Sequence, residues 1–245
     1  MRRLSSRQDA YGHGMYDFYQ GRDGHEIVER DDGLLALSGG PATYLTPYDE
    51  WPQHQKDAIA LAKGKVLDIG CGAGRVGLHL QSRGLDVTGI DVSPLAIKVC
   101  KLRGLRKTHV LSITQAMGRL GTFDTIVMYG NNFGLLGGFG RARWLLRRFR
   151  RMTSSEALII AESHDPYATT APHHLAYHRL NRRLGRMGGQ LRIRVRYLTY
   201  ATPWFDYLLA SKDEMKTILK GTGWAAGRFI DSESGTYIGV IEKGR

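Results

Sequence analysis

The sequence predicts an α/β fold built on a mostly parallel sheet, and three observations support this. Apolar runs of strand length alternate with helical patterns between residues 64 and 163. Parallel strands need such intervening segments, because each right-handed crossover returns the chain to the same end of the sheet. A glycine-rich turn follows the first apolar run, and two strand-like segments close the chain after a final helix. We therefore expect one main domain with a buried sheet.

The first strand, Val66–Ile69, runs directly into the turn Gly70–Gly74. Its three glycines allow close backbone approach, and the amides that open the next helix favour an anionic group. A dinucleotide fingerprint places its third glycine one position later, where this chain has Arg75, and this argues against NAD. Asp68 lies inside the strand end, so its carboxylate is expected to face the cofactor or an ammonium group on it.

The second strand, Leu85–Asp91, ends in an acid 21 residues after Gly70. At this separation an acid on the adjacent strand reaches the hydroxyls of a ribose. Ser93 and Pro94 then form a helix start, with a capping hydroxyl and a proline at the first helical position. The helix is expected to run to about Arg103.

Asp68, the glycine turn and Asp91 together resemble the class I S-adenosylmethionine-dependent methyltransferases over residues 65–161. The resemblance implies S-adenosylmethionine as cofactor and a Rossmann-like sheet of seven strands, mostly parallel with the last antiparallel. The family often has an acid where Ser112 stands. The resemblance implies the following contacts: Asp68 near the amino group, directly or through water; Gly70, Cys71 and Gly72 at the methionine portion; Asp91 at the ribose hydroxyls; Val92 against the adenine; Ser112 and Ile113 at the adenine edge.

The remaining core elements follow from apolar periodicity. A helix after the glycine turn and a basic helix are expected between the later strands. These predicted elements are a helix over 76–83, strand three over 109–113, strand four over 123–130, the basic helix over 140–152 and strand five over 156–162.

The flanks of this core are less regular. Residues 1–63 are expected to be an N-terminal cap or lid that ends in a helix over 50–62, and residues 64–163 the cofactor-binding core. Residues 164–210 form an inserted basic segment with an antiparallel hairpin over 191–210 on the substrate side. In residues 211–245, Ser211 and Glu214 form a capping box for a helix ending near Gly221. The strands 224–230 and 236–242 follow.

Catalytic candidates come from loops at the carboxyl ends of the strands, where ligands bind in open α/β sheets. Asn131 and Asn132 follow strand four, so Asn131 is a candidate for catalysis and the methionine portion, and Asn132 for the acceptor. The alternative is a turn in which each asparagine bonds its own backbone. His164 follows strand five and is a candidate base or acceptor ligand, although a lone loop histidine is more often structural. A base is needed only for a nucleophile that loses a proton.

Aromatic residues of both flanks are candidates for a lid over the acceptor. Tyr44 and Tyr48 belong to the N-terminal segment and Trp204 to the hairpin. The alternative is that they pack in the core, which is the commoner fate of aromatic residues.

A metal site is not predicted. His173, His174 and His178 stand close together, but no carboxylate accompanies them at ligand spacing, and the neighbouring arginines would repel a cation.

Positive charge is concentrated in one part of the chain, which carries a net charge of +12. Residues 141–196 hold thirteen arginines against three acidic residues. Such a segment favours an anionic partner such as RNA, a phosphorylated metabolite or an acidic protein. The alternative is a solvated arginine-rich face, and the chain has no RNP, KH or zinc-finger motif.

Composition favours a cytoplasmic protein. With 245 residues, of which 42% are hydrophobic, the chain can bury one sizeable core. Its two cysteines have no CxxC partner, so neither a disulfide framework nor a zinc site is expected. No apolar run reaches membrane-spanning length, and no signal-peptide pattern follows the basic N-terminus.

The function predicted from the sequence is transfer of a methyl group from S-adenosylmethionine to an O, N or S atom of a small-molecule acceptor, with an anionic acceptor among the expected partners. Two alternatives remain at this point. One is an RNA or ribosome-associated methyltransferase that uses the basic segment, and the other is a non-catalytic S-adenosylmethionine-binding protein.

Overall fold

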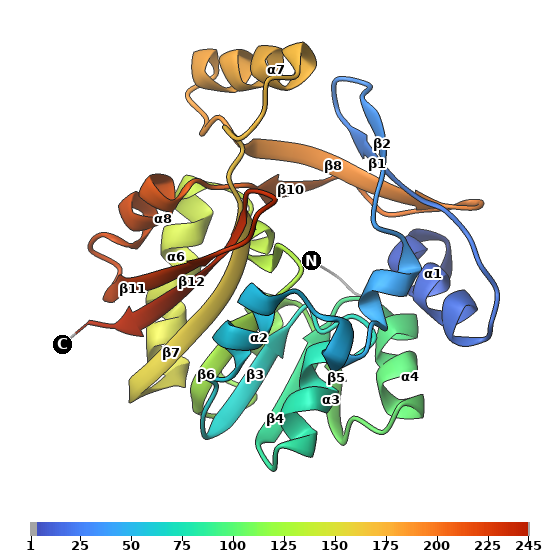
Figure 1. The fold of residues 1–245 in the computed structure, drawn as a ribbon, viewed down its shortest axis with the longest axis vertical. Coiled ribbons are helices and arrows are strands. Elements are labelled where there is room, and N and C mark those ends of the chain that lie inside the picture. The colour runs from blue at the N-terminus through green and yellow to red at the C-terminus, as the bar shows by residue number, and fades with distance from the viewer. Residues whose placement is uncertain (1–3, 245) are drawn as a thin grey trace. The chain divides into compact units, whose positions relative to one another are not determined.

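The computed structural model describes residues 4–244, and the chain folds as two compact units (Figure 1). The first unit comprises the chain up to Trp51, Lys63–Gly121 and Ile193–Phe205. The second comprises Pro52–Ala62, Thr122–Arg192 and the chain from Asp206 on.

A seven-stranded sheet has the order β11-β12-β7-β6-β3-β4-β5, which confirms the predicted fold class. In the first unit β4 lies parallel to both β3 and β5, and in the second unit β6 lies parallel to β7. β12 is antiparallel to β7, and β11 is antiparallel to β12. The strands are β3 (Lys65–Ile69), β4 (Asp86–Asp91), β5 (Lys107–Val110), β6 (Phe123–Met128), β7 (Thr153–His164), β11 (Trp224–Asp231) and β12 (Thr236–Lys243).

The helices of the first unit begin where the sequence provides start signals. Ser93 accepts a hydrogen bond from the amide of Ala96 at 2.9 Å, and Pro94 opens the helix, as predicted. α1 packs on α4. The helices are α1 (Ala10–Tyr19), α3 (Arg75–Ser82), α4 (Pro94–Leu102) and α5 (Ile113–Ala116), with 3-10 turns at Ser6–Gln8, Pro41–Tyr44 and Tyr48–Glu50.

The second unit confirms the capping box. The hydroxyl of Ser211 accepts from the amide of Glu214 at 3.2 Å, and the carboxylate of Glu214 accepts from the amide of Ser211 at 3.0 Å. The helices are α2 (Gln53–Ile59), α6 (Phe139–Phe149), α7 (Pro172–Arg183) and α8 (Lys212–Leu219), with 3-10 turns at Asn132–Leu136 and Arg150–Met152.

The basic helix α6 shows why arginines accumulate there. Its buried residues, Ala142, Leu145, Leu146 and Phe149, recur at helical spacing and form one apolar face. The arginines between them therefore lie mostly on the other face. Part of the positive charge of residues 141–196 is thus the solvated side of an amphipathic helix.

A second, smaller sheet joins the inserted segment to the N-terminal segment. It has the order β10-β8-β1-β2, and β9 pairs with β8 as the predicted hairpin. β8 also pairs antiparallel with β1, and this places Arg194 opposite Glu29. The strands are β1 (Glu26–Arg30), β2 (Leu35–Leu37), β8 (Gln190–Tyr197), β9 (Tyr200–Ala201) and β10 (Phe205–Leu208).

Several predicted bounds were wrong. The leading helix is shorter than 50–62, and strand five is longer than 156–162. Strand three ends at Val110 instead of Ile113, because Ser112 opens α5: its amide donates to the side-chain oxygen of Gln115 at 3.0 Å. The sequence pattern did not indicate α1, α5, α7, β1 or β2.

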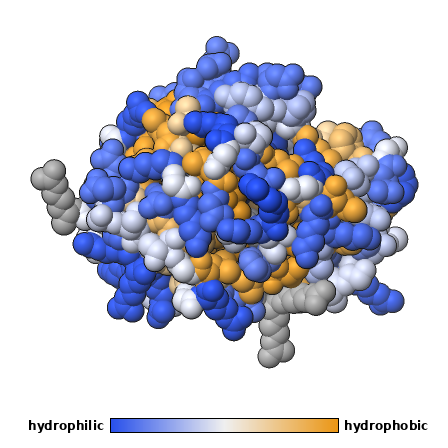
Figure 2. Space-filling model, turned by 90° about the horizontal axis from the view of Figure 1, so that it is seen from below, coloured by the Kyte–Doolittle hydropathy of each residue, from blue (hydrophilic) through white to orange (hydrophobic). Residues whose placement is uncertain are grey.

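None of the helices in the described part of the chain is both long and apolar enough to span a bilayer. On the face shown in Figure 2, hydrophilic residues repeatedly interrupt the hydrophobic ones.

We expect Asp9 to be a stability determinant of the first unit. Its buried carboxylate caps two helices, accepting from the amides of Gly12 at 3.2 Å and Leu95 at 3.1 Å. Asp9→Ala should lower the free energy of unfolding by about 2–4 kcal/mol, since two buried donors lose their acceptor. Asp9→Asn, which keeps one acceptor oxygen, should lose less. Urea unfolding measures both, and equal stability of wild type and Asp9→Ala would contradict this assignment.

Candidate active site

The glycine turn in the first unit has a backbone that only glycine adopts without strain. Gly70, Gly72 and Gly74 have φ angles of 68°, 54° and 81°. The amides of Gly70 and Cys71 both donate to the carbonyl of Ile90, at 2.9 and 3.1 Å, so the turn is fixed to the end of β4. α3 starts immediately afterwards at Arg75.

The N-terminal segment covers this turn. A Cβ on Gly72 would lie 3.4 Å from the methyl carbon of Met15 on α1 and 3.8 Å from the ring of Tyr44. Tyr44 therefore lies against the turn. The hydroxyl of Tyr44 donates to the carboxylate of Glu26 at 3.0 Å, which anchors the tyrosine to β1.

Asp91 ties the glycine turn to the start of α4. Its two carboxylate oxygens accept from the amides of Gly72 at 3.1 Å and Ser93 at 2.9 Å. Burial raises its pKa to about 6, against the effect of these amide donors. Each oxygen retains a second lone pair, so Asp91 can still accept from ribose hydroxyls.

Asp68 is buried at the end of β3 and has spare hydrogen-bonding capacity. The amide of Gly77 in α3 hydrogen bonds to it, whereas its Oδ2 has no hydrogen-bond partner among residues 4–244. Burial, with the nearby charge of Asp91, raises its pKa to about 7. A buried acceptor of this kind fits a donor such as an ammonium group, directly or through water.

The other predicted cofactor residues surround this pair in sequence but differ in exposure. Cys71 is buried, with its sulfur 3.9 Å from that of Cys100, so it would contact a cofactor only through its backbone. Val92 is half-buried. Ser112 and Ile113 are buried at the start of α5 and not at a strand end. Their contact with the adenine stays a prediction.

In the second unit, Asn131 follows β6 in a strained conformation. Its φ of 59° lies in the left-handed region, which a non-glycine residue adopts at a cost. Its carbonyl accepts from the hydroxyl of the half-buried Tyr207 at 2.6 Å. Its side-chain oxygen Oδ1 is buried without a hydrogen-bond partner in the part of the chain that the structure describes. Asn132 is half-buried and opens the next 3-10 turn.

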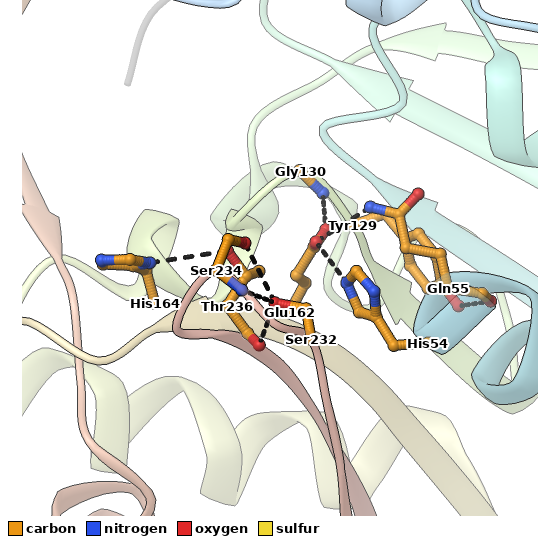
Figure 3. A network of polar contacts seen from close by, with 9 residues as sticks. All are labelled: His54, Gln55, Tyr129, Gly130, Glu162, His164, Ser232, Ser234 and Thr236. Atoms are coloured by element: carbon orange, nitrogen blue, oxygen red, sulfur yellow. Dashed lines mark hydrogen bonds and ion pairs between the residues drawn. The ribbon is translucent and has the colours of Figure 1, made fainter. Parts of the chain in front are cut away.

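A buried carboxylate that the sequence analysis missed lies near the end of β7. Glu162 accepts from the side-chain amide of Gln55 at 2.9 Å and from the amide of Gly130 at 2.5 Å (Figure 3). His54 Nε2 lies 3.6 Å from Glu162 Oε1, an ion-pair distance that is too long for a hydrogen bond. The hydroxyl of Tyr129 donates to the carbonyl of Gln55 at 2.8 Å and fixes the start of α2 to the end of β6.

Burial by itself would raise the pKa of Glu162, but the nearby nitrogen groups of His54, Gln55 and Gly130 outweigh it, so the pKa lies below its ordinary value. Glu162 is therefore charged at neutral pH. One sequence signal could have identified it, since it is an acid that ends the apolar run Ala157–Ala161. Its partner Gln55 could not be predicted, because the two residues are 107 positions apart in the sequence.

The remaining candidates lie in separate surroundings. His164 contacts the hydroxyl of Thr236 at 3.5 Å and lies apart from the carboxylate of Glu162 in Figure 3. Tyr48 stacks on His79, with ring centroids 3.8 Å apart. Trp204 lies under the guanidinium of Arg194 at 4.7 Å. Of the three aromatic candidates, the structure thus brings only Tyr44 to the glycine turn.

Acidic partners already neutralise part of the arginine-rich segment. Glu29 accepts from Arg194 and Arg196 at 2.7 and 2.5 Å, and these hydrogen bonds lower the pKa of Glu29 to about 2. Arg192 pairs with Asp206 at 3.2 Å. Across the described residues, no group of three or more His, Cys, Asp or Glu side chains could hold a metal ion.

We expect the affinity for S-adenosylhomocysteine to fall as the pH falls. An ammonium group favours ionised carboxylates, and Asp68 and Asp91 take up protons near pH 7 and 6. Binding at pH 5.5 should be about 100-fold weaker than at pH 8, because both protonated carboxyl groups must first ionise. Calorimetry over this range tests it, and Asp68→Asn should flatten the profile. A flat wild-type profile would refute the assignment.

Asp91→Ala should weaken S-adenosylhomocysteine binding by about tenfold or more, since two hydrogen bonds to ribose would be lost. His164→Ala should change it little. Calorimetry compares the two variants, and equal effects would show that the ribose is bound elsewhere.

Part of the chain is similar to a known methyltransferase domain. Residues 66–156 match a family model described as a methyltransferase domain. A solved S-adenosylmethionine-dependent methyltransferase from Bacteroides fragilis, in complex with S-adenosyl-L-homocysteine, is similar over 99% of this chain and 98% of its own, with a TM-score of 0.84 and 23% identity. The predicted class I methyltransferase fold is thereby confirmed, and residues 66–156 match a methyltransferase domain as expected.

Curated relatives match over shorter stretches. The Bacillus subtilis (strain 168) protein YqeM, named as a methyltransferase, is 24% identical over 49% of this chain and 50% of its own length. A protein from Psychrobacter arcticus named ubiquinone biosynthesis O-methyltransferase is 38% identical over 30% of this chain and 32% of its own. The chain therefore covers half or less of the length of these relatives.

Proposed function

From the methyltransferase domain in residues 66–156 and the class I fold, we propose that this protein transfers a methyl group from S-adenosylmethionine to an O, N or S atom of a small-molecule acceptor. The observation that carries the proposal is the pair of buried carboxylates on adjacent strands beside a glycine turn. Asp68 keeps an unpartnered oxygen, and Asp91 holds the turn through the amide of Gly72.

The residues present fit the cofactor. The bound cofactor supplies an activated methyl group on a sulfonium. Gly70 and Gly72 leave space for close approach of its methionine portion, Asp68 accepts from its amino group, and Asp91 accepts from both ribose hydroxyls. Val92, with Ser112 and Ile113, is assigned to the adenine.

We assign acceptor binding to side chains that follow the end of β6 and to one side chain of the N-terminal segment. Asn131 and Asn132 follow β6, and ligands of open α/β sheets bind beyond the carboxyl ends of the strands. Tyr44 lies against the glycine turn, so it is positioned to exclude water from bound cofactor. Holding the nucleophile in line with the methyl group supplies much of the rate, on the order of 7–11 kcal/mol for a well-aligned pair.

One observation favours RNA as a second candidate acceptor. On α6, Arg148 stacks over the half-exposed Trp144 at 4.4 Å and Arg143 over Phe139 at 5.4 Å. Exposed aromatic rings with arginines are a common platform for bases. Against it, the acidic partners of Arg192, Arg194 and Arg196 reduce the free charge of the segment.

Calorimetry against S-adenosylmethionine, S-adenosylhomocysteine and NAD is the first test. We expect binding of the first two in preference to NAD, because Arg75 stands where the dinucleotide motif has its third glycine. Preferential binding of NAD would refute the proposal.

The second test is incubation of the protein with methyl-labelled S-adenosylmethionine and fractionated cell extract. We expect the label in the metabolite fraction. Label in RNA, with binding that weakens steeply as salt rises, would favour the RNA acceptor. Cofactor binding without label in any fraction would indicate a non-catalytic protein.

A further inference from the structure

We propose that His54 takes the proton from a hydroxyl group of the acceptor and that Glu162 positions His54 for this step. The inference rests on the proposed function and narrows it, because it makes the acceptor atom an oxygen that must lose a proton. All residues that carry it belong to the second unit.

The first line of evidence is the pairing of an imidazole with a buried carboxylate. His54 on α2 and Glu162 on β7 are 8% and 3% exposed, and their nearest ring nitrogen and oxygen are 3.6 Å apart. A carboxylate beside one ring nitrogen fixes the orientation and tautomer of the imidazole and stabilises the positive charge that it gains with a proton. The other ring nitrogen, Nδ1, is then the one that accepts the proton.

The second line is that the carboxylate is held charged and immobile. Gln55 and the backbone of Gly130 donate to it, and Tyr129 in turn fixes Gln55 (Figure 3). An ionised carboxylate costs several kcal/mol to bury unless donors surround it. Three nitrogen groups converge on Glu162, and the His54 contact is the loosest of them. Such a contact can shorten when a ligand binds, as catalytic hydrogen bonds often do.

The third line is unused hydrogen-bonding capacity in the same cluster. Among residues 4–244, the side-chain oxygen Oδ1 of Asn131 is buried without a hydrogen-bond partner, whereas Nε2 of His54 faces Glu162 at 3.6 Å. Asn131 directly follows Gly130, whose amide binds Glu162. Buried polar atoms without partners are rare in folded proteins and indicate a missing ligand group or water. Asn131 is suited to accept from a second polar group of the acceptor.

The proton transfer balances with methyl transfer. The acceptor O–H bond breaks as the imidazole nitrogen of His54 takes the proton. The oxygen forms a bond to the methyl carbon, and the carbon–sulfur bond breaks with its electron pair left on sulfur. The products are a methyl ether, a neutral thioether and a protonated His54, which returns its proton to water. The titratable group that faces His54 is Glu162, at 3.6 Å; the hydroxyl of Tyr129 donates to the carbonyl of the adjacent Gln55, and that of Tyr207 donates to the carbonyl of Asn131.

The test compares His54→Gln and Glu162→Gln with wild type in the labelling assay on the metabolite extract, over pH 5.5–9. Glutamine can still donate to Glu162 from position 54 but cannot act as a base. At saturating S-adenosylmethionine, where protonation of Asp68 and Asp91 does not limit the rate, we expect His54→Gln to reduce methyl transfer at pH 7 about 100-fold or more and to lose the fall in rate at acidic pH. Glu162→Gln should reduce the rate less and move this fall to lower pH. The labelled product should be a methyl ether by mass spectrometry.

His178→Gln is the matched control, since His178 is also a buried histidine of the second unit and packs on Tyr167. It should transfer methyl groups as wild type does. Thermal unfolding and S-adenosylhomocysteine affinity of all three variants should stay within a few degrees and twofold of wild type, which separates catalysis from folding.

Two results would overturn the role of His54 but leave the proposed function intact. One is a His54→Gln variant with a rate within threefold of wild type and an unchanged pH profile. The other is a product methylated on an atom with no proton to lose, such as a thioether sulfur. Cofactor binding without any methyl transfer by wild type would instead overturn the proposed function, and this inference with it.

Discussion

The carboxylate of Asp91 is the contact on which the candidate cofactor site depends. By accepting from the amides of Gly72 and Ser93, it links the glycine turn after β3 to the start of α4. The turn has left-handed φ angles that only glycine adopts without strain, and these amide contacts hold it in place. Burial raises the pKa of Asp91, which means that its ionised form is destabilised in the fold. A ligand that donates hydrogen bonds to the carboxylate would reduce this destabilisation.

Glu162 in the second unit is also a buried carboxylate, but its burial is compensated in a different way. Three nitrogen groups of the protein itself surround it, and its pKa is lowered although it is buried. Asp68 keeps an oxygen without a partner, whereas both oxygens of Glu162 are engaged. Asp68 can therefore bind a ligand through its free oxygen, whereas Glu162 is suited to hold a neighbouring side chain. The two carboxylates are assigned different roles for this reason.

The fold could largely be predicted from the sequence, and a candidate donor site could be proposed from it, because the signals for both are local. Alternating apolar runs, the glycine turn, Asp91 at a fixed separation and the Ser93-Pro94 and Ser211 helix starts each depend on a few neighbouring residues. The errors arose where contacts are remote in sequence. The pairing of β1 with β8 joins residues about 165 apart, so the two strands of the N-terminal segment were not predicted.

The sequence by itself determined the alternation of strands and helices along the chain and the helix starts, and it predicted the acids expected at the cofactor. Only the tertiary structure decided which histidine stands beside a carboxylate. His164 follows a strand and was the candidate on that ground, yet it is His54, 108 residues before Glu162, that lies 3.6 Å from it. No pattern in a single sequence indicates that the start of α2 and the end of β7 are in contact. That contact depends on how α2 packs, and packing is a property of the folded chain.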